Sequence, residues 1–394
     1  MPLVAGLYMI TQDDTETVKG ERLRVIMHID LDYFYAQCEE IKRPEIKNNP
    51  VVVCIYSGRK EDSGVVSTSN YIARNYGIKS AMPIKMAKSK LVNLPGAVFL
   101  QADTRYYSEK SAAAMSVIKR LAEKFEYVGL DECFIDMTQM TKSNFIEAKR
   151  FAEQLKKNIM KETGLTCSIG VASNKLLAKI ASDLHKPDGL TIITPENPIK
   201  FISKYDVEKI PGIGPKTRKK LTKMGIKSID ELSKMNLFKM IEEFGKRTAI
   251  YLHNASKGID HEPVESQEVR KQIGRIITLR HDISKSYEVY DELEKLCKCV
   301  HQLTQNKNLS FKNIGILLIE SNLHNISHSK TLKSYSRDYN ELYTTAKLIL
   351  NEALNKGNDD NNKQIKIRRL GVRVSDLKDN SGQNTIFDFI KYNQ

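Results

Sequence analysis

The chain has 394 residues, and its 62 lysines and arginines exceed its 48 aspartates and glutamates, which gives a net charge of +14. This length accommodates about two to four domains, and the positive charge predicts a polyanionic partner, either nucleic acid or an acidic membrane surface. No run approaches the roughly 18 apolar residues of a membrane span, and residues 3–10 are too short for a signal peptide and lack a preceding basic region. We therefore expect no membrane association and a cytoplasmic location. The six cysteines show no CxxC spacing, so we expect them to be reduced and to bind no zinc.

The first informative stretch is MHIDLDYFYAQCEE, residues 27–40. Its apolar beginning predicts a strand that delivers Asp30 and Asp32 to its end, where they would share a face if the strand continued. Three aromatic residues follow before a predicted helix, namely Tyr33, Phe34 and Tyr35. A carboxylate beside phenolic side chains suits a metal ion and the sugar of a nucleotide. Solvated or turn-capping aspartates are the ordinary alternative.

A second pattern lies at residues 51–78. An apolar run at 51–55 predicts a buried strand, and a short helix is predicted to begin at Asn70 and to end at Gly77. Tyr71 and Arg74 are three residues apart, so on a helix they share a face and could both contact one triphosphate. An ordinary amphipathic helix would explain the same spacing.

Residues 102–193 alternate predicted helices, at 106–124 and 143–162, with predicted strands, which favours a mixed sheet with helices on one face. Between the helices, two β-prone runs at residues 124–130 and 133–137 predict a hairpin with adjacent acids at its tip. Adjacent acids usually stay in water unless a cation neutralises them.

Asp30, Asp131 and Glu132 would form a three-carboxylate cluster if their strands are neighbours in one sheet. Ligation by oxygen alone suits Mg²⁺. Two such ions would clamp the attacking and leaving oxygens of a phosphoryl displacement.

A strand is predicted at residues 166–171 and a helix at 174–185, with Ser173 as its N-cap. Lys175 and Lys179 are one turn apart on this helix, and Lys186 follows it. Solvated lysines on a helix face are the ordinary interpretation of this pattern.

Four stretches in this order resemble the catalytic core of a Y-family translesion DNA polymerase: HIDLDYFYAQCEE, SGRKEDSGVVSTSNYIARNYGI, YVGLDECFIDMT and SIGVASNKLLAKIASDLHKPDG. The resemblance is to the DinB-type (DNA polymerase IV) branch, especially its archaeal members, and it runs from about residue 24 to 376. It implies an α+β multidomain, right-hand polymerase. By resemblance, residues 1–23 are an N-terminal extension, residues 24–33 and 102–193 form a ferredoxin-like palm, and residues 34–101 form small fingers. Residues 194–261 form a helical thumb, residues 262–271 are a linker, residues 272–376 form an α/β little finger, and residues 377–394 are a tail.

The resemblance also implies residue roles. Asp30, Asp131 and Glu132 would be catalytic and would hold two Mg²⁺ ions, for which Mn²⁺ can substitute, with the carbonyl of Leu31 as a further ligand. The incoming deoxynucleoside triphosphate would contact Tyr33, Phe34, Tyr35, Tyr71, Arg74 and Lys186. Tyr35 would exclude a 2′ hydroxyl, and the small side chains of Val65 and Ser67 would lie over the nascent base pair. Leu31 and Gly129 depart from residues common in relatives, but neither position supplies a side-chain ligand.

The thumb stretch contains IPGIGPK, residues 210–216, which predicts a helix-hairpin-helix. Gly212 and Gly214 would let backbone N–H groups approach a DNA phosphate, and Lys216 would add charge. Residues 209–227 hold seven basic residues and no acid, which favours DNA binding without sequence preference. A plain turn with a solvated basic face is the alternative.

The region after the linker has strand-like runs at residues 273–277, 314–319 and 365–374 and helical patterns at 286–303 and 340–355. Our candidates for contacts to the DNA backbone are Arg275, Arg368, Arg369 and Arg373, although basic residues on edge strands also block aggregation. Residues 378–382 are predicted to be a linker. The last stretch resembles a sliding-clamp peptide, carried by Gln383, Ile386, Phe387, Phe389 and Ile390, of bacterial or archaeal type. A frayed amphipathic tail is the alternative.

The expected function is template-directed addition of deoxynucleotides to a primer 3′ end, with low fidelity, lesion bypass and no proofreading, by a monomer. A nucleotidyl cyclase could place paired aspartates on a similar sheet, but it needs no template and no helix-hairpin-helix. A non-catalytic DNA-binding adaptor would explain the basic regions but not the three carboxylates.

Overall fold

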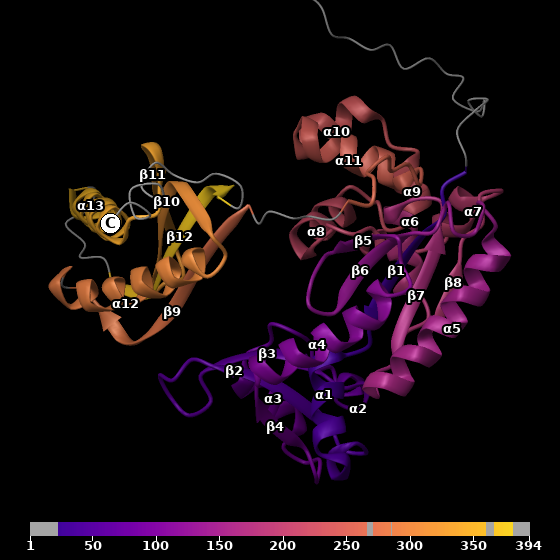
Figure 1. Cartoon of the computed structure of the whole chain (residues 1–394), viewed down its shortest axis with the longest axis horizontal. Helices are drawn as coiled ribbons and strands as arrows, with labels where there is room; N and C mark the ends of the chain where they lie inside the picture. Colours follow the sequence, from indigo (N-terminus) through magenta and orange to yellow (C-terminus); the bar gives the residue numbers. More distant parts are fainter. Residues whose placement is uncertain (1–22, 266–270, 285, 360–365, 381–394) are drawn as a thin grey trace, which may run out of the picture. The chain divides into compact units, whose positions relative to one another are not determined.

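The structure, a computed structural model, describes residues 23–265, 271–284, 286–359 and 366–380 (Figure 1). Its contacts divide the chain into two units, each made of two segments: Met1–Lys42 with Asp103–Ser266, and Arg43–Ala102 with Gln267–Gln394. In the described part of the chain, no helix combines the length and apolar character that crossing a membrane requires.

The first unit is built on a five-stranded sheet with the order β5-β6-β1-β7-β8, in which only β7 and β8 run parallel. The strands are β1 (Ile26–Leu31), β5 (Lys124–Tyr127), β6 (Glu132–Asp136), β7 (Cys167–Ala172) and β8 (Leu190–Ile192). Helix α4 (Thr104–Lys119) lies between β1 and β5 in the chain, and α5 (Phe145–Thr163) lies between β6 and β7. This β-α-β-β-α-β arrangement confirms the predicted ferredoxin-like topology.

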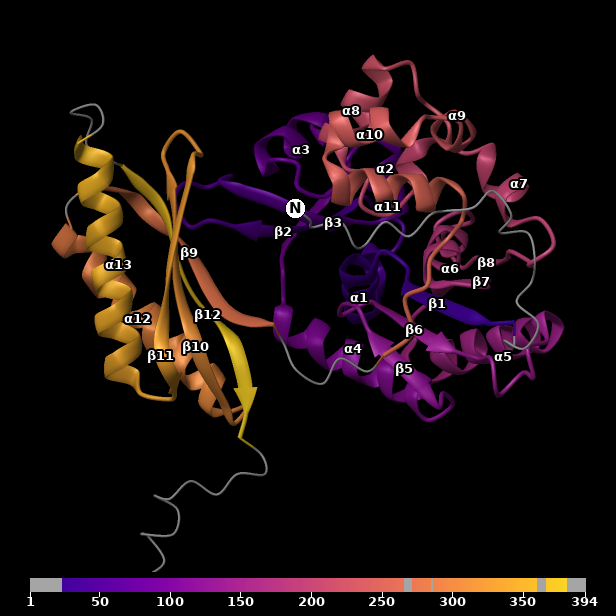
Figure 2. The same cartoon turned by 90° about the horizontal axis from the view of Figure 1, so that it is seen from above.

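Side chains of β1 alternate between the two faces of this sheet. Ile26 belongs to the core that also contains α6 (Lys175–Ser182), and His28 contacts Ser182 at the end of that helix. Asp30 therefore faces the same side as α6. Helices α4 and α5 pack against each other, as Figures 1 and 2 show. Gly170 on β7 lets α6 approach closely, because a Cβ there would overlap the carbonyl oxygen of Ala178.

Helix α1 (Phe34–Lys42) belongs to the first unit and not to the fingers, which were predicted to span residues 34–101. The Gln37 side-chain amide donates to the Asp32 carbonyl (2.7 Å), and the Tyr107 hydroxyl of α4 donates to Glu39 Oε1 (2.7 Å). Because these buried bonds tie α1 to the five-stranded sheet and to α4, the boundary between the units falls after Lys42.

Helices α4 and α6 are both shorter than predicted. Helix α4 ends at Lys119 rather than at residue 124, because β5 begins at Lys124. Helix α6 begins at Lys175, and its N-cap is Asn174 rather than Ser173, because the Asn174 side chain accepts a hydrogen bond from the Leu177 N–H (2.9 Å).

Short helices complete the first unit and share a core with α6. They are α7 (Pro198–Ser203), a 3₁₀ turn (Val207–Lys209), α8 (Pro215–Lys223), α9 (Ile229–Ser233), α10 (Leu237–Phe244) and α11 (Lys246–Ser256). The predicted linker at 262–271 begins later than expected. Val264 is buried, and the Glu265 N–H donates to Glu126 Oε2 (3.1 Å), so these residues pack onto the first unit.

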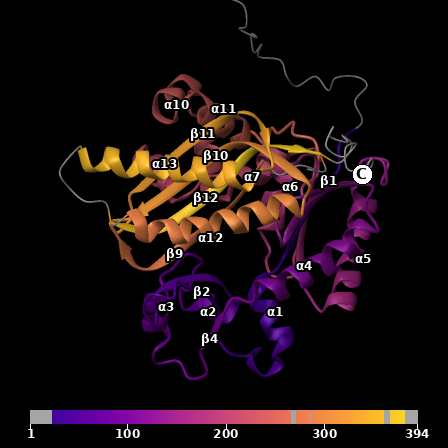
Figure 3. The same ribbon diagram turned by 60° about the vertical axis from the view of Figure 1, so that its left-hand side comes forward.

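The second unit contains a three-stranded sheet of order β3-β2-β4 and a four-stranded antiparallel sheet of order β11-β10-β12-β9. The smaller sheet and its helices are β2 (Val51–Tyr56), β3 (Gly64–Ser69), β4 (Val98–Gln101), a 3₁₀ turn (Pro44–Ile46), α2 (Tyr71–Asn75) and α3 (Ile84–Leu91). The larger sheet and its helices are β9 (Gln272–Ile283), α12 (Ser286–Gln305), β10 (Leu309–Glu320), β11 (Asn325–Ser336), α13 (Tyr339–Asp359) and β12 (Ile367–Asp379). Helices α12 and α13 pack together on one face of the larger sheet (Figures 2 and 3).

Two features of the larger sheet were not predicted. Strand β11 is polar and mostly exposed, so its sequence carries little apolar alternation. Strand β12 continues to Asp379, so Lys378 and Asp379 pair with β10 and are not part of a linker.

Candidate active site

Three acids meet at one end of the five-stranded sheet. Asp30 on β1 lies opposite Glu132, the first residue of β6, and directly opposed residues of neighbouring strands share a face. The Leu31 N–H donates to the carbonyl of Asp131 (2.8 Å), which ties the tip of the β5-β6 hairpin to the end of β1. The predicted neighbourhood of the two strands is therefore confirmed.

Lys186 neutralises Asp30. Its Nζ lies 2.8 Å from Asp30 Oδ2 and 2.7 Å from Asp183 Oδ1. Burial raises the pKa of Asp30 to about 6, although Lys186 opposes this rise. Burial alone would lower the pKa of Lys186, but the two carboxylates outweigh it and the pKa is raised. Lys186 is thus a partly buried cation at the carboxylate end of the sheet.

Glu132 is held from the α6 side. It pairs with Lys179 Nζ, and its Oε2 lies 3.2 Å from Nε2 of the fully buried His28. The hydrogen bond with His28 and, to a lesser extent, the interaction with Lys179 lower the pKa of Glu132 to about 2. The ordinary interpretation of Lys175 and Lys179 as solvated lysines does not hold, because Lys175 likewise pairs with Glu126 Oε1 (2.8 Å).

The donor chemistry of this site suits a hard cation. Among the described residues, no three His, Cys, Asp or Glu side chains lie close enough together to hold one metal ion, and the carboxylates of Asp30 and Glu132 are turned to lysines. Burial raises the pKa of Cys133, and it raises that of Cys167 to about 12, so both remain neutral thiols rather than thiolate ligands. Carboxylate oxygens are therefore the available charged ligands, and they fit Mg²⁺ or Mn²⁺.

Asp32 has a structural role. Strand β1 ends at Leu31, so the condition under which Asp30 and Asp32 would share a face is not met. Asp32 is fully buried and accepts hydrogen bonds from Ser168 Oγ (2.7 Å) and from the Asp188 N–H (2.8 Å). It thereby fixes the loop that carries Lys186.

The aromatic residues after β1 form an ordered group. Tyr33 has a positive φ of 34°, and its hydroxyl donates to Glu40 Oε2 (3.1 Å). Phe34 is buried, whereas Tyr35 is half-buried and stacks on Tyr107, with ring centroids 4.4 Å apart and an interplanar angle of 15°. Burial and then the negative charge of Asp131 raise the pKa of Tyr35. Tyr35 thus presents a fixed ring near the acids.

Other predicted nucleotide contacts belong to the second unit. The Arg74 guanidinium lies over the Tyr71 ring, 4.8 Å from its centroid, and Arg74 Nε donates to the Ser69 carbonyl (2.9 Å). The predicted shared helix face is confirmed. On β3, exposed Val65 and partly exposed Ser67 flank buried Val66, so they occupy the accessible face of the strand.

The predicted DNA-binding residues fall in both units. In the first, Gly212 has a φ of 86°, Gly214 is the N-cap of α8, and exposed Lys216 lies in the first turn of that helix. In the second, Arg275 lies on β9, and Arg368, Arg369 and Arg373 lie on β12. The predicted clamp residues Gln383, Ile386, Phe387, Phe389 and Ile390 lie outside the described residues.

His28, Lys179 and Asp183 contact the predicted site but were not predicted to belong to it. His28 precedes Asp30 by two residues, so strand alternation places both on one face. Lys179 lies on α6, and Asp183 is the C-cap of that helix, four residues later. Lys186 follows three residues after Asp183, so the spacing indicates that the three side chains share one face. Those spacings were the available sequence signals.

Comparison with known proteins agrees with this architecture. The model of the impB/mucB/samB family matches residues 29–183, the model of its C-terminal domain matches residues 270–386, and a model described as the DNA polymerase-iota thumb domain matches residues 208–260. The chain is 44% identical over 367 residues to DNA polymerase IV of Nitrosopumilus maritimus, covering 93% of this chain and 99% of that protein. It is 34% identical to DNA polymerase IV of Staphylococcus aureus (strain JH9), with the same coverage.

Solved structures are also similar. The Y-family DNA polymerase chimera Dbh-Dpo4(243-245)-Dbh superposes with a TM-score of 0.82 at 31% identity, covering 90% of this chain and all of that one. An insertion ternary complex of Dbh DNA polymerase gives a TM-score of 0.67 at 31% identity with the same coverage. The fold and the acidic end of its sheet thus define a DNA-directed DNA polymerase of the right-hand type. The chain belongs to the Y family of DNA polymerases, in its DinB-type branch, whose members act in translesion synthesis and DNA repair.

Proposed function

We propose that this polymerase extends a primer by two-metal phosphoryl transfer at the carboxylate end of the five-stranded sheet, with low fidelity and without proofreading, as a monomer. The observation that carries the proposal is the register pair of Asp30 and Glu132, with Asp131 tied to the end of the same strand. Acids of this kind at one sheet end are costly to keep together unless cations neutralise them.

Asp30, Asp131 and Glu132, with the Leu31 carbonyl, would hold the two ions. When bound, Mg²⁺ supplies charge neutralisation for the triphosphate and lowers the pKa of the primer 3′ hydroxyl. Lys179 and Lys186 balance Glu132 and Asp30, whereas Asp131 makes no ion pair among the described residues. The chain itself therefore contributes chiefly position and charge.

The cationic residues would bind the triphosphate. Lys186 is partly buried at the site, so its charge is less screened there than on an open surface. Arg74 and Tyr71 act as a preassembled pair, since the guanidinium is already fixed over the ring. Val65 and Ser67 would lie over the nascent base pair, where small side chains leave room for a distorted template base and lower selectivity.

Removal of the metal tests the proposal. Primer extension should cease in EDTA and return with excess Mg²⁺ or Mn²⁺, while binding of primer-template DNA measured by fluorescence anisotropy should persist. The physical reason is that the metal serves the transfer step, whereas exposed basic residues bind the DNA. Extension that continues at full rate in EDTA would contradict the metal assignment.

DNA would be held by the hairpin before α8 and by the arginines of the second unit. Gly212 has the backbone conformation of a tight turn, and Gly214 is the exposed N-cap of α8, whose first N–H groups follow Pro215. Free N–H groups at a helix start attract phosphate. Lys216, Arg275, Arg368, Arg369 and Arg373 would add charge without reading bases.

The tail would tether the polymerase to a sliding clamp through Gln383, Ile386, Phe387, Phe389 and Ile390. Deleting residues 383–394 should leave distributive primer extension unchanged and should abolish its stimulation by the clamp, because the apolar anchors would be lost. The measurement is product length with and without the loaded bacterial-type or archaeal-type clamp. Equal stimulation of both forms would exclude this tether.

A further inference from the structure

The four-stranded sheet has one face covered by α12 and α13, and no helix of the described part of the second unit packs on its other face. Ile273, Val372 and Ile316 belong to the core beneath the helices. Side chains alternate along a strand, so their neighbours lie on the open face. On that face, residues that pair across the strands form four rows, each with one residue from β9, β12, β10 and β11 in that order. The rows are Gln272, Ser375, Asn313 and Thr331; Gly274, Arg373, Gly315 and Ser329; Ile276, Gly371, Leu317 and Ser327; and Thr278, Arg369, Ile319 and Asn325.

These rows hold no acid, and their only charged residues are two arginines on β12. In the row of Arg373, both flanking strands carry glycine. Within the part of the chain that the structure describes, Arg373 makes no ion pair, and Arg369 Nε is buried without a hydrogen-bond partner. A face of this kind leaves cationic groups available to an anionic ligand.

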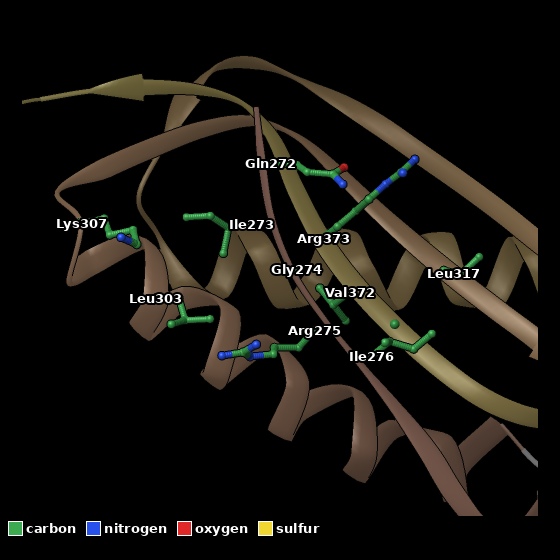
Figure 4. A pocket seen from close by; sticks show the side chains of 11 residues that line it. Gln272, Ile273, Gly274, Arg275, Ile276, Leu303, Lys307, Leu317, Val372 and Arg373 are labelled. Carbon is green, nitrogen blue, oxygen red and sulfur yellow. The ribbon is translucent and has the colours of Figure 1, made fainter. Parts of the chain in front are cut away.

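The two glycines accommodate the Arg373 side chain. A Cβ at Gly274 would lie 2.9 Å from Cβ of Arg373, and a Cβ at Gly315 would lie 2.8 Å from its Nε, 3.1 Å from its Cγ and 3.5 Å from its Cδ. The arginine stem therefore starts between the two glycines and runs across Gly315. Figure 4 shows Arg373 and Gln272 on the open face of the sheet, and Arg275 and Leu303 on the face that carries the helices. These four residues line a cavity of about 460 Å³ at β9.

We infer that Gly315 is a positioning residue, which keeps the Arg373 side chain flat on the sheet so that its guanidinium meets a phosphate of the bound DNA. This inference rests on the proposed contact between Arg373 and DNA. An arginine whose stem is already confined loses less rotamer freedom on binding than a free one. Gly274 would contribute to the same slot, but a Cβ there would also lie 2.9 Å from the Val372 carbonyl oxygen, so its substitution would disturb the backbone.

The test is a double-mutant cycle on DNA affinity, measured by anisotropy with labelled primer-template DNA in the full-length protein. Arg373→Ala should weaken binding about tenfold and lower the slope of log Kd against log salt by about one. Gly315→Ala should weaken binding about fivefold, because its methyl would push the Arg373 side chain aside at Cγ, Cδ and Nε while leaving its charge in place. The double variant should bind no more weakly than Arg373→Ala alone.

Gly371→Ala is the matched control. Gly371 lies on the same face. A Cβ there would make its nearest contacts at 3.4 Å, an ordinary van der Waals distance, and these contacts are with Arg275 and Ile276 rather than with Arg373. It should leave DNA affinity unchanged, and thermal unfolding should verify that all variants fold. If Arg373→Ala weakens binding but Gly315→Ala does not, or if the two losses add, the positioning role is overturned while the DNA contact stands. If Arg373→Ala itself has no effect, the contact and the inference both fail, whereas primer extension by the wild type still tests the polymerase mechanism.

Discussion

Replacing Asp131 and Glu132 together by alanine should abolish primer extension while DNA binding persists. Asp131 is tied to the end of β1 and Glu132 lies opposite Asp30, so the change removes two of the three acids at the sheet end. Loss of the ions they would hold should reduce the single-turnover rate by at least about 1000-fold, which corresponds to about 4 kcal/mol in the barrier. Rapid-quench incorporation of one nucleotide measures this rate.

The matched control is Asp291→Ala/Glu292→Ala, which removes the same charge from adjacent positions of α12 in the second unit. This control should keep the wild-type rate. DNA affinity of the Asp131/Glu132 variant should equal or slightly exceed that of the wild type, because two negative charges are lost. A catalytic rate within a few-fold of wild type would show that these acids do not carry the reaction.

Tyr35→Ala should admit ribonucleotides while DNA synthesis continues. The Tyr35 ring is fixed by stacking on Tyr107, whose hydroxyl is bound to Glu39. A rigid ring can exclude a 2′ hydroxyl, whereas the methyl of alanine leaves space for it. The preference for deoxynucleotides, expressed as the ratio of kcat/KM values for a dNTP and the matching rNTP, should fall on the order of 100-fold.

Tyr35→Phe provides the control for this substitution. It retains the ring and its stacking partner and loses only the hydroxyl, so sugar selection should stay close to that of the wild type. An unchanged dNTP to rNTP ratio in Tyr35→Ala would remove the steric role. A fall in both variants would assign selection to the hydroxyl instead of the ring.

The sequence predicted the parts of the site whose position depends on local patterns. An apolar run ending at Asp30 and two β-prone runs around Asp131 predict strands and a hairpin, and the structure places them side by side. The pair of Tyr71 and Arg74 was predictable for the same reason, since three residues on a helix bring side chains to one face.

The remaining contacts depend on tertiary packing. Lys179 reaches Glu132 only because α6 lies across β1 and β7, and Gly170 permits that close approach. Asp32 resembles Asp30 in sequence, yet its burial against Ser168 gives it a structural role. Strand β11 was missed because it is polar and is held by pairing with β10 rather than by an apolar face of its own.

The most direct measurement is Mg²⁺-dependent primer extension by the wild-type protein on an undamaged template and on the same template with one abasic site. We expect extension to the end of the undamaged template and continued synthesis past the abasic site, with no product in EDTA. Synthesis that stops before the abasic site would contradict lesion bypass. The absence of extension on both templates, with DNA binding intact, would contradict the account of the carboxylate site as a whole.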